Sequence, residues 1–305
     1  MTEYLPEGEL FKLPQNALHT ANISALEEMM KKKTIAEGIC TLCDSNHNLI
    51  VDLGFTSGII PRNEGAIGIE DGSTRDIALI SRVNKPVCFM VKRITKDKKI
   101  ILSRKDAQEK CLTEFISKKM CGDVINAKVT HLESFGAFVD IGCGIPSLVP
   151  IDLISVSRIS HPSDRFTVGQ NIKAVIKSVE NNKITLTHKE LLGTWEENAN
   201  LYSIGETVTG IVRSVESYGI FVELTPNLAG LAEVKEGVQA GNMVSVYIKA
   251  IIPDKMKVKL IIVDNFESLI DKKTIPCKYF NESEHIKSWV YSTDSCNKNV
   301  RTDFD

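Results

Sequence analysis

The feature that most constrains this chain is a repeat with one fixed spacing. The segment Phe135-Gly-Ala-Phe-Val-Asp140 returns as Tyr218-Gly-Ile-Phe-Val-Glu223, and Gly122 returns as Gly205. The spacing is 83 residues in each case, from 122 to 205 and from 135 to 218. Self-similarity at a constant period is typical of a module repeated along a chain. The sequence therefore predicts tandem copies of one small domain.

The residues at the start of each copy have the alternation of a β-strand. Ile125, Ala127 and Val129 are apolar, and the residues between them are polar. Such a period of two is typical of a half-buried strand with one apolar face. In the next strand, Phe138 falls on the polar side together with Asp140. An aromatic ring on a polar face needs an explanation beyond the core.

A second ring accompanies the first in both copies. Phe135 precedes Phe138 by three residues, so a regular strand would send the two rings to opposite faces. Gly136 permits a β-bulge or a positive φ, and either would return both rings to one side. Tyr218 and Phe221 repeat the arrangement. The pattern favours a base-stacking platform worth about 1–3 kcal/mol per base, and packing between domains is the alternative.

A diverged third copy precedes these two. Leu49-Ile-Val-Asp-Leu-Gly54 aligns with residues 137–142, but His47 and Ile50 stand where the other copies have rings. Five short strands per copy with glycine-marked turns fit the partly open Greek-key barrel of the OB-fold, whose strands 2 and 3 bind oligonucleotides. The sequence thus predicts a mainly β protein with three tandem five-stranded OB-fold barrels joined by short α-helical connectors.

Helical spacing and turn residues set the expected boundaries. Trp195 is expected to pack on a neighbouring barrel. The helix before the first barrel is expected to pack on that barrel, with a methionine-rich partner-binding face as the alternative. The expected segments are an N-terminal extension with a helix (1–33), a degenerate barrel (34–104), a connector helix (105–120), a barrel (121–187), a connector helix (188–204), a barrel (205–264) and a tail (265–305) with room for a short hairpin, in which no structure is assigned to the last ten or so residues.

Composition and charge limit the classes of function. The net charge of the 305 residues is −2. Lys and Arg number 10 against 8 acids in 34–104, 7 against 7 in 121–190, and 6 against 6 in 205–262. Nucleic-acid binders are usually basic, so any bound nucleic acid must be held largely by stacking and shape. The acidic N-terminus, the lack of a long apolar run and the eight dispersed cysteines predict a cytoplasmic protein with free thiols and no membrane partner.

Motifs for catalysis or metal binding are weak. Cys40 and Cys43 have zinc or redox spacing, but no second pair accompanies them, so a structural role is favoured. The six histidines are scattered, and no phosphate-cradling glycine loop is present. We therefore predict no enzyme activity, no metal and no cofactor. The densest basic run, residues 92–105, has two interpretations, a solvated strand edge and a site for RNA or phosphate.

The repeat resembles a known family. Gly122, Val129, Phe135-Gly-Ala-Phe-Val-Asp-Ile-Gly142, Gly169-Gln170 and Ile184-Thr-Leu-Thr187 match the pattern of the S1 RNA-binding domain. Residues 34–262 as a whole resemble the family of bacterial ribosomal protein S1 in a short form, faintly in the first copy. The family's histidine after the third strand is replaced by Pro150 and Glu233, and its arginine near the last strand pair by Lys183 and Lys257.

The resemblance implies single-stranded RNA, in particular mRNA, as the ligand and the small ribosomal subunit as a partner. It also implies a role in translation, with residues 1–104 as the docking part. Two alternatives remain, an RNA regulator that acts off the ribosome and a protein scaffold without RNA affinity. The candidate RNA-binding residues are Lys128, His131, Phe135, Phe138 and Lys183 in the second copy, and Arg213, Tyr218, Phe221 and Lys257 in the third.

Overall fold

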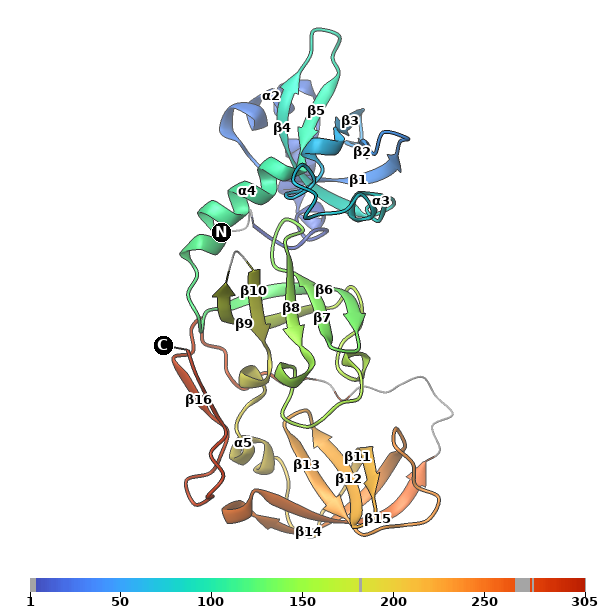
Figure 1. Cartoon of the computed structure of the whole chain (residues 1–305), viewed down its shortest axis with the longest axis vertical. Helices are drawn as coiled ribbons and strands as arrows, with labels where there is room; N and C mark the ends of the chain where they lie inside the picture. The colour runs from blue at the N-terminus through green and yellow to red at the C-terminus, as the bar shows by residue number, and fades with distance from the viewer. Residues whose placement is uncertain (1–3, 181–182, 267–274, 276, 305) are drawn as a thin grey trace. The chain divides into compact units, whose positions relative to one another are not determined.

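The computed structural model describes residues 4–180, 183–266, 275 and 277–304. It divides into two compact units (Figure 1). Unit 1 comprises Met1–Lys119 and Asp140–Pro146, and unit 2 comprises Met120–Val139 and Ser147–Asp305. None of the helices in the described ranges is both long and apolar enough to cross a membrane.

Three closed five-stranded barrels confirm the predicted fold class. In each, the third and fifth strands pair in parallel while the other pairings given are antiparallel. The strands of barrel 1 are β1 Ala36–Cys43, β2 Leu49–Asp52, β3 Ser57–Ile60, β4 Pro86–Ile94 and β5 Ile100–Ser103. Those of barrel 2 are β6 Val124–Glu133, β7 Gly136–Asp140, β8 Pro146–Pro150, β9 Asn171–Glu180 and β10 Lys183–Thr187. Those of barrel 3 are β11 Thr207–Glu216, β12 Gly219–Thr225, β13 Leu228–Ala232, β14 Met243–Ile252 and β15 Lys257–Phe266.

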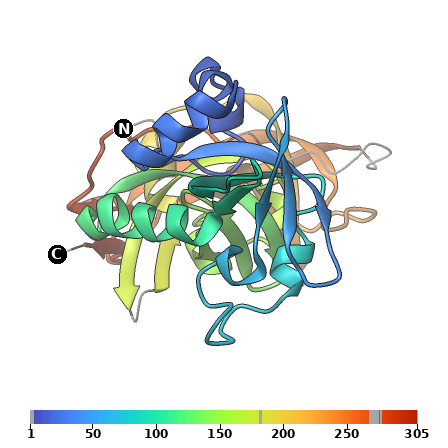
Figure 2. The ribbon, with the colours of Figure 1, turned by 90° about the horizontal axis from the view of Figure 1, so that it is seen from above.

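In unit 1 the N-terminal helices pack against the barrel and share its hydrophobic core. The unit contains η1 Leu10–Lys12, α1 Pro14–His19, α2 Ile23–Lys32, η2 Arg62–Glu64, α3 Ile77–Ile80, α4 Arg104–Glu114 and η3 Ile116–Lys118. Helices α2 and α4 both pack against β4 (Figure 2). The side chain of Asn22 caps α2 by accepting the N–H of Ala25 at 3.0 Å. Leu26 and Met29 are buried in the core of barrel 1, so packing on the barrel, and not a free methionine-rich face, accounts for this helix.

A buried ion pair fastens the start of the chain to unit 1. The Glu7 carboxylate accepts hydrogen bonds from Arg104 Nε at 2.6 Å, from Arg82 Nη1 at 3.1 Å and from the N–H of Cys88 at 3.1 Å. Burial alone would raise the pKa of Glu7, but the charges of Arg104 and Arg82 outweigh it and lower the pKa below its ordinary value. A buried charge needs such partners to avoid a large desolvation cost, so the N-terminal extension is tied to its barrel.

In unit 2 the C-terminal tail is part of the structure. The connectors are short, namely η6 Lys189–Leu192 and α5 Trp195–Ala199, and η4 Ile151–Leu153, η5 Pro162–Asp164 and η7 Pro253–Lys255 lie within loops. In the tail, β16 Ser288–Val290 pairs with β17 Arg301–Asp303. Trp289, Tyr291 and Phe304 join one buried cluster with Trp195 and the core of barrel 3. This confirms the packing expected for Trp195. The β16–β17 pair is the short hairpin considered for the tail, and β17 lies within the last residues, to which no structure was assigned.

A buried histidine lies where barrel 2 meets the tail. His188 is fully buried, with Nδ1 3.0 Å from the carbonyl oxygen of Ile154 and Nε2 3.3 Å from the hydroxyl of Tyr279. Its ring meets Phe166 and Tyr279 edge to face. Burial lowers the pKa of His188 from 6.5 to about 4, because the imidazolium would lose its hydration.

We predict that unit 2 loses stability as the pH falls from 6.5 to 4. The unfolded chain binds the proton of His188 more tightly than the folded one, so this contribution is complete above pH 6.5 and is lost by pH 4. The full difference corresponds to about 3 kcal/mol. Urea unfolding followed by tryptophan fluorescence measures it, because Trp195 and Trp289 are both buried in unit 2. The H188Q variant should show a flatter pH dependence, and equal pH dependence in the two proteins would contradict the assignment.

Candidate nucleic-acid interface

The rings of each repeated motif lie together on the outside of the barrel. Phe135 and Phe138 meet edge to face with centroids 5.9 Å apart, and Tyr218 and Phe221 do so at 6.2 Å. Phe135 is 54% exposed and Tyr218 is 68% exposed, although large aromatic side chains are usually mostly buried. The two pairs occupy equivalent positions in barrels 2 and 3. Each barrel thus presents one exposed ring beside one half-buried ring.

The rings share a side because of a two-residue turn, and in barrel 3 Gly219 also has the positive φ considered from the sequence, 157°. Phe135 and Tyr218 are the second residues of two-residue turns that precede β7 and β12, so neither ring belongs to the strand itself. In barrel 3 the register shift lies between Val212 and Ser214 on β11, away from the glycine. At Gly136, φ is not in the left-handed range. The turn, and not a distorted strand, brings the rings together.

The glycine after each turn permits close approach of the next strand. A Cβ on Gly136 would stand 2.6 Å from the carbonyl oxygen of Val149, and one on Gly219 would stand 2.8 Å from that of Ala232. A clash with backbone cannot be relieved by a side-chain rotation. The glycine is therefore required by packing at both positions.

The strand registers define an outer row of side chains around each barrel. In barrel 3, Ser214 pairs with Phe221, Phe221 with Leu231, Leu231 with Lys259, and Lys259 with Ala250. Paired residues in a sheet project to the same face. The row therefore places a ring, an aliphatic side chain and a cation side by side. We use the term outer row for these five positions in each barrel.

Barrel 2 has the same outer row with different residues. Thr185 pairs with Leu148 and with Ser178, and Leu148 is the counterpart of Leu231. At the position of Ser214 barrel 2 has His131, whose ring lies 6.5 Å from that of Phe138 at an interplanar angle of 28°. His131 Nε2 is 2.7 Å from Glu133 Oε1. The predicted residues His131, Phe135 and Phe138 thus form one cluster.

The predicted lysines lie at the edge of this surface. Lys183 and Lys257 begin β10 and β15 and are exposed. Each is two residues from the row position on its strand, so it projects from the same outer face. Lys259 lies in the outer row itself and was not predicted. Exposed and buried residues alternate along the start of β15, so the pattern that placed Lys257 outside could also have indicated Lys259. Lys128 is half-buried opposite Asn171 on the β6–β9 pair, and its RNA contact stays a prediction.

The RNA contact of Arg213 stays a prediction, and in the structure its guanidinium is engaged in ion pairs. Its Nε donates to the buried carboxylate of Glu223 at 2.5 Å, and its Nη1 lies 3.6 Å from Asp164. Glu223 also accepts from Arg165 Nη2 at 2.6 Å, and the side chains of both residues are fully buried. Burial alone would raise the pKa of Asp164, but Arg213 and hydrogen bonds from Ser160 and His161 lower it. The Arg213 guanidinium is thus committed to a buried ion cluster that joins barrels 2 and 3.

Four of the five positions in the outer row of barrel 1 are aliphatic, and the fifth is Arg93. Leu42 pairs with Ile50, Ile50 with Ile59, Ile59 with Ile101, and Ile101 with Arg93. Leu42 is 54% exposed, and the three isoleucines are half-buried. His47 lies in a longer loop, with Nδ1 4.0 Å from Asp76. This row offers apolar contact but no ring on which a base could stack.

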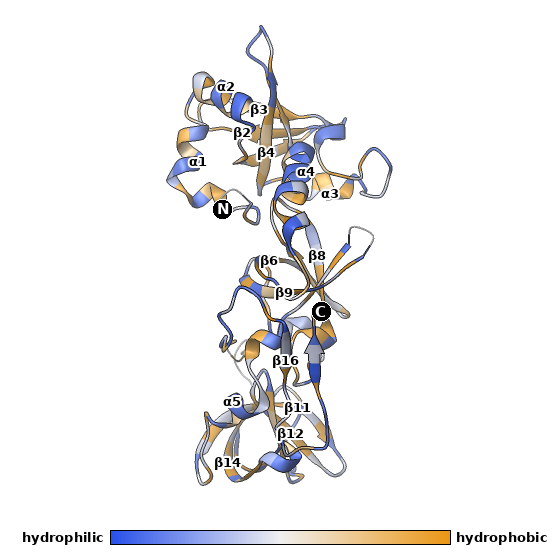
Figure 3. Cartoon of the chain, turned by 90° about the vertical axis from the view of Figure 1, so that its left-hand side faces the viewer, coloured by the Kyte–Doolittle hydropathy of each residue, from blue (hydrophilic) through white to orange (hydrophobic). Residues whose placement is uncertain are grey.

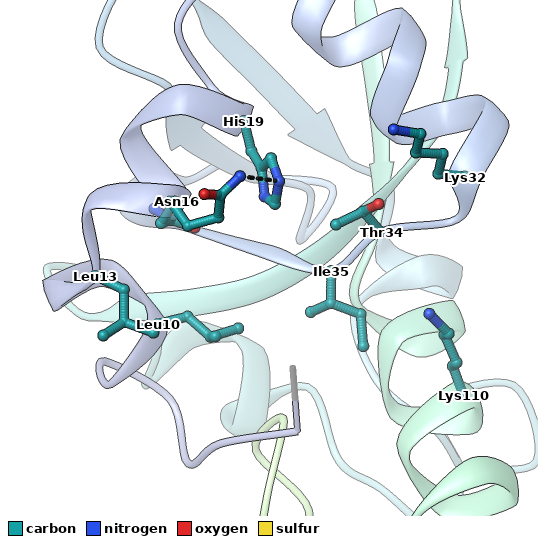
Figure 4. Close-up of a pocket in the computed structure, with 9 residues that line it drawn as sticks. Leu10, Leu13, Asn16, His19, Lys32, Thr34, Ile35 and Lys110 are labelled. Atoms are coloured by element: carbon teal, nitrogen blue, oxygen red, sulfur yellow. Dashed lines mark hydrogen bonds between the residues drawn. The ribbon is translucent and has the colours of Figure 1, made fainter. Parts of the chain in front are cut away.

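Other candidate sites have ordinary structural explanations. Cys40 is buried and its thiol faces the carbonyl of Leu42 at 3.6 Å, and both thiols of the Cys40–Cys43 pair are free. Within the ranges described, no group of three or more His, Cys, Asp or Glu side chains could hold a metal ion. A hollow of about 380 Å³ in unit 1 is shown in Figure 4. Its polar lining is already engaged, since Asn16 pairs with the backbone of Glu37 and Lys32 with Glu28.

Comparison with known proteins identifies the class. Residues 118–189 match the model of the S1 RNA-binding domain, so barrel 2 is an S1 domain. Barrels 1 and 3 are also closed five-stranded barrels, so the chain contains an S1 domain together with two barrels of similar topology.

The more specific relatives are ribosomal proteins. The chain is 34% identical over 196 residues to small ribosomal subunit protein bS1 of Leuconostoc lactis, which covers 62% of this chain and 44% of the relative. It is 28% identical over 286 residues to bS1 of Staphylococcus aureus (strain MRSA252), covering 86% and 70%. The chain spans about a third to a half of the length of the first curated relatives it matches.

One solved structure is also similar. It is a multidomain protein with nucleic acid binding domains from Streptococcus pneumoniae, with a TM-score of 0.25 and 13% identity over 78% of this chain and 76% of that one. The similarity to bS1 proteins in sequence is the informative result, and it places this chain among their relatives.

We predict that Arg213→Met destabilises unit 2 without weakening RNA binding by the folded protein. Glu223 keeps Arg165 but loses one charged hydrogen bond, which costs about 1–3 kcal/mol. Urea unfolding and RNA affinity at a temperature where the variant is folded are the two measurements. If the variant keeps its stability but binds RNA more than tenfold more weakly, this prediction is contradicted and Arg213 contacts RNA directly.

Proposed function

We propose that barrels 2 and 3 bind single-stranded RNA by stacking bases on their paired rings. The observation that carries the proposal is the recurrence of one exposed ring beside one half-buried ring at the same register in both barrels. Every base has a stackable face, so the interaction tolerates many sequences. The S1 domain match at 118–189 supports the same ligand for barrel 2.

Lysines around the rings supply the phosphate contacts. Lys183 in barrel 2 and Lys257 with Lys259 in barrel 3 are exposed on the outer face that carries the rings. A lysine neutralises a phosphate as a point charge without the bidentate geometry of arginine. With few phosphates neutralised, the RNA affinity should fall only gently with salt.

The biological setting follows from the relatives. Proteins named small ribosomal subunit protein bS1 are similar over more than half of this chain, which supports a cytoplasmic role in translation in which the chain associates with the small ribosomal subunit and holds mRNA. Unit 1 is the docking part in this proposal. Its ring-free, aliphatic outer row of Leu42, Ile50, Ile59 and Ile101 suits contact with protein.

Two other functions fit the chain less well. A regulator that acts off the ribosome would use the same RNA surface, and it differs only in its partner. A scaffold without RNA affinity leaves four rings exposed or half-exposed at equivalent positions without a purpose. We propose no enzyme activity, because the repeated surface consists of rings and lysines without a nucleophile paired to a base.

The decisive variant replaces the four rings Phe135, Phe138, Tyr218 and Phe221 by alanine. Its affinity for a 15-nucleotide polyuridine should fall at least about 30-fold, or about 2 kcal/mol, because stacking supplies most of the binding. Fluorescence anisotropy at two salt concentrations measures it.

The matched control removes three phenylalanines and one tyrosine that lie exposed elsewhere: Phe11, Phe55, Tyr247 and Phe266. It should bind polyuridine within about threefold of wild type. Equal losses in the two variants would show that the platform has no special role, and the absence of binding by wild type would leave the scaffold function.

A further inference from the structure

The basic run of unit 1 separates into two groups in the structure. Lys92, Arg104 and Lys105, which lie near the barrel body, are neutralised by carboxylates. Lys92 pairs with Glu64 at 2.5 Å, Arg104 with Glu7 at 2.6 Å, and Lys105 with Glu70 at 2.6 Å.

Four cations at the end of the β4–β5 hairpin form the other group. Arg93, Lys96, Lys98 and Lys99 are exposed, and in the part of the chain that the structure describes none has a carboxylate partner. Only Asp97 lies among them. The hairpin extends beyond the other strands of its barrel, and its end is hydrophilic (Figures 1 and 3). We call residues 93–99 the basic finger.

The basic finger is held in one shape by its own hydrogen bonds. The N–H of Thr95 donates to the carbonyl of Lys99 at 2.9 Å, and the N–H of Lys98 donates to the carbonyl of Thr95 at 2.9 Å. The N–H of Lys99 donates to Thr95 Oγ1 at 3.0 Å, and Lys98 has a left-handed φ of 59°. A closed turn spaces the four cations before any ligand arrives, which reduces the ordering cost of binding.

Barrel 3 shows that such charge is not a property of the fold. The end of its β14–β15 hairpin has Lys255 and Lys257 beside Pro253, Asp254 and Met256. The equivalent hairpin of barrel 1 therefore carries more positive charge than that of barrel 3, in the barrel whose outer row has no ring. This combination indicates a ligand recognised by its phosphates and not by its bases.

We propose that the basic finger binds the phosphate backbone of double-stranded RNA, without sequence preference. A duplex hides its bases from stacking and presents two rows of phosphates, which suits a finger of cations on a barrel whose outer row has no ring for a base. A single strand gains little here, because its affinity for such proteins depends on stacked bases. This site stands apart from the ring platform of unit 2 and takes a different form of RNA.

The test compares two probes and three variants of the full chain. The probes are a 20-base-pair RNA duplex and the 15-nucleotide polyuridine. The finger variant is Arg93→Gln, Lys96→Gln, Lys98→Asn and Lys99→Gln, in which asparagine tolerates the left-handed φ. The charge-matched control is Lys12→Gln, Lys31→Gln, Lys85→Gln and Lys118→Gln, four exposed lysines elsewhere in unit 1. The third variant is the four-ring alanine variant.

The finger variant should bind the duplex at least tenfold more weakly than wild type at low salt. The slope of log affinity against log salt should become shallower by about 3, because about four phosphate contacts are lost. Its polyuridine affinity should stay within about threefold. The charge-matched control should keep its duplex affinity within about threefold, and the four-ring variant should lose polyuridine and keep the duplex.

Three results would overturn the proposal. One is equal loss of duplex affinity in the finger variant and the charge-matched control, and another is no duplex binding by wild type. The third is tighter binding of poly-L-glutamate than of the duplex at equal charge, which would make the finger a site for acidic protein. Polyuridine binding tests the ring platform, and duplex binding tests the basic finger. Failure of one site is therefore distinguishable from failure of the other.

Discussion

Closure of five short strands into a barrel is the constraint on which the rest of this protein depends. Closure turns alternate side chains of every strand into core, as the buried Val222, Val244 and Val246 of barrel 3 show. Only the outward positions remain free to differ between copies. The three outer rows differ accordingly, with a phenylalanine and a histidine in barrel 2, a phenylalanine and a lysine in barrel 3, and leucine, isoleucine and one arginine in barrel 1. One fold thereby offers different surfaces at the same register.

Buried charges then join segments that lie far apart in the chain. Glu7 holds the N-terminal extension through Arg104 and Arg82 in unit 1, and Glu223 joins barrels 2 and 3 through Arg165 and Arg213. Glu223 is the acid of the repeated motif, and in barrel 2 the same position is Asp140, which accepts from the N–H of Glu7 at 2.7 Å. Burial and the nearby Glu7 raise the pKa of Asp140 to about 7. The motif's acid therefore serves as an attachment point, while its rings face solvent.

The sequence predicted local features well and distant pairings poorly. The positions of Phe138 and Phe221 followed from strand alternation, because alternation depends on neighbours in the chain. The ion pairs of Arg213 could not be predicted, because its partner Glu223 and the second donor, Arg165, meet only after two barrels pack. The order of the C-terminal tail depends likewise on burial of Trp289 and Tyr291 against barrel 3. The shared side of the rings was predicted, but its cause is a two-residue turn.

The central claim is that the outer rows of barrels 2 and 3, and not that of barrel 1, contact single-stranded RNA. The most direct measurement is photocrosslinking of a 4-thiouridine-containing polyuridine to the full chain, with the crosslinked residues identified by mass spectrometry. We expect crosslinks in the segments that contain Phe135, Phe138, Tyr218 and Phe221. Crosslinks confined to the aliphatic outer row of barrel 1 or to the C-terminal tail would contradict the claim.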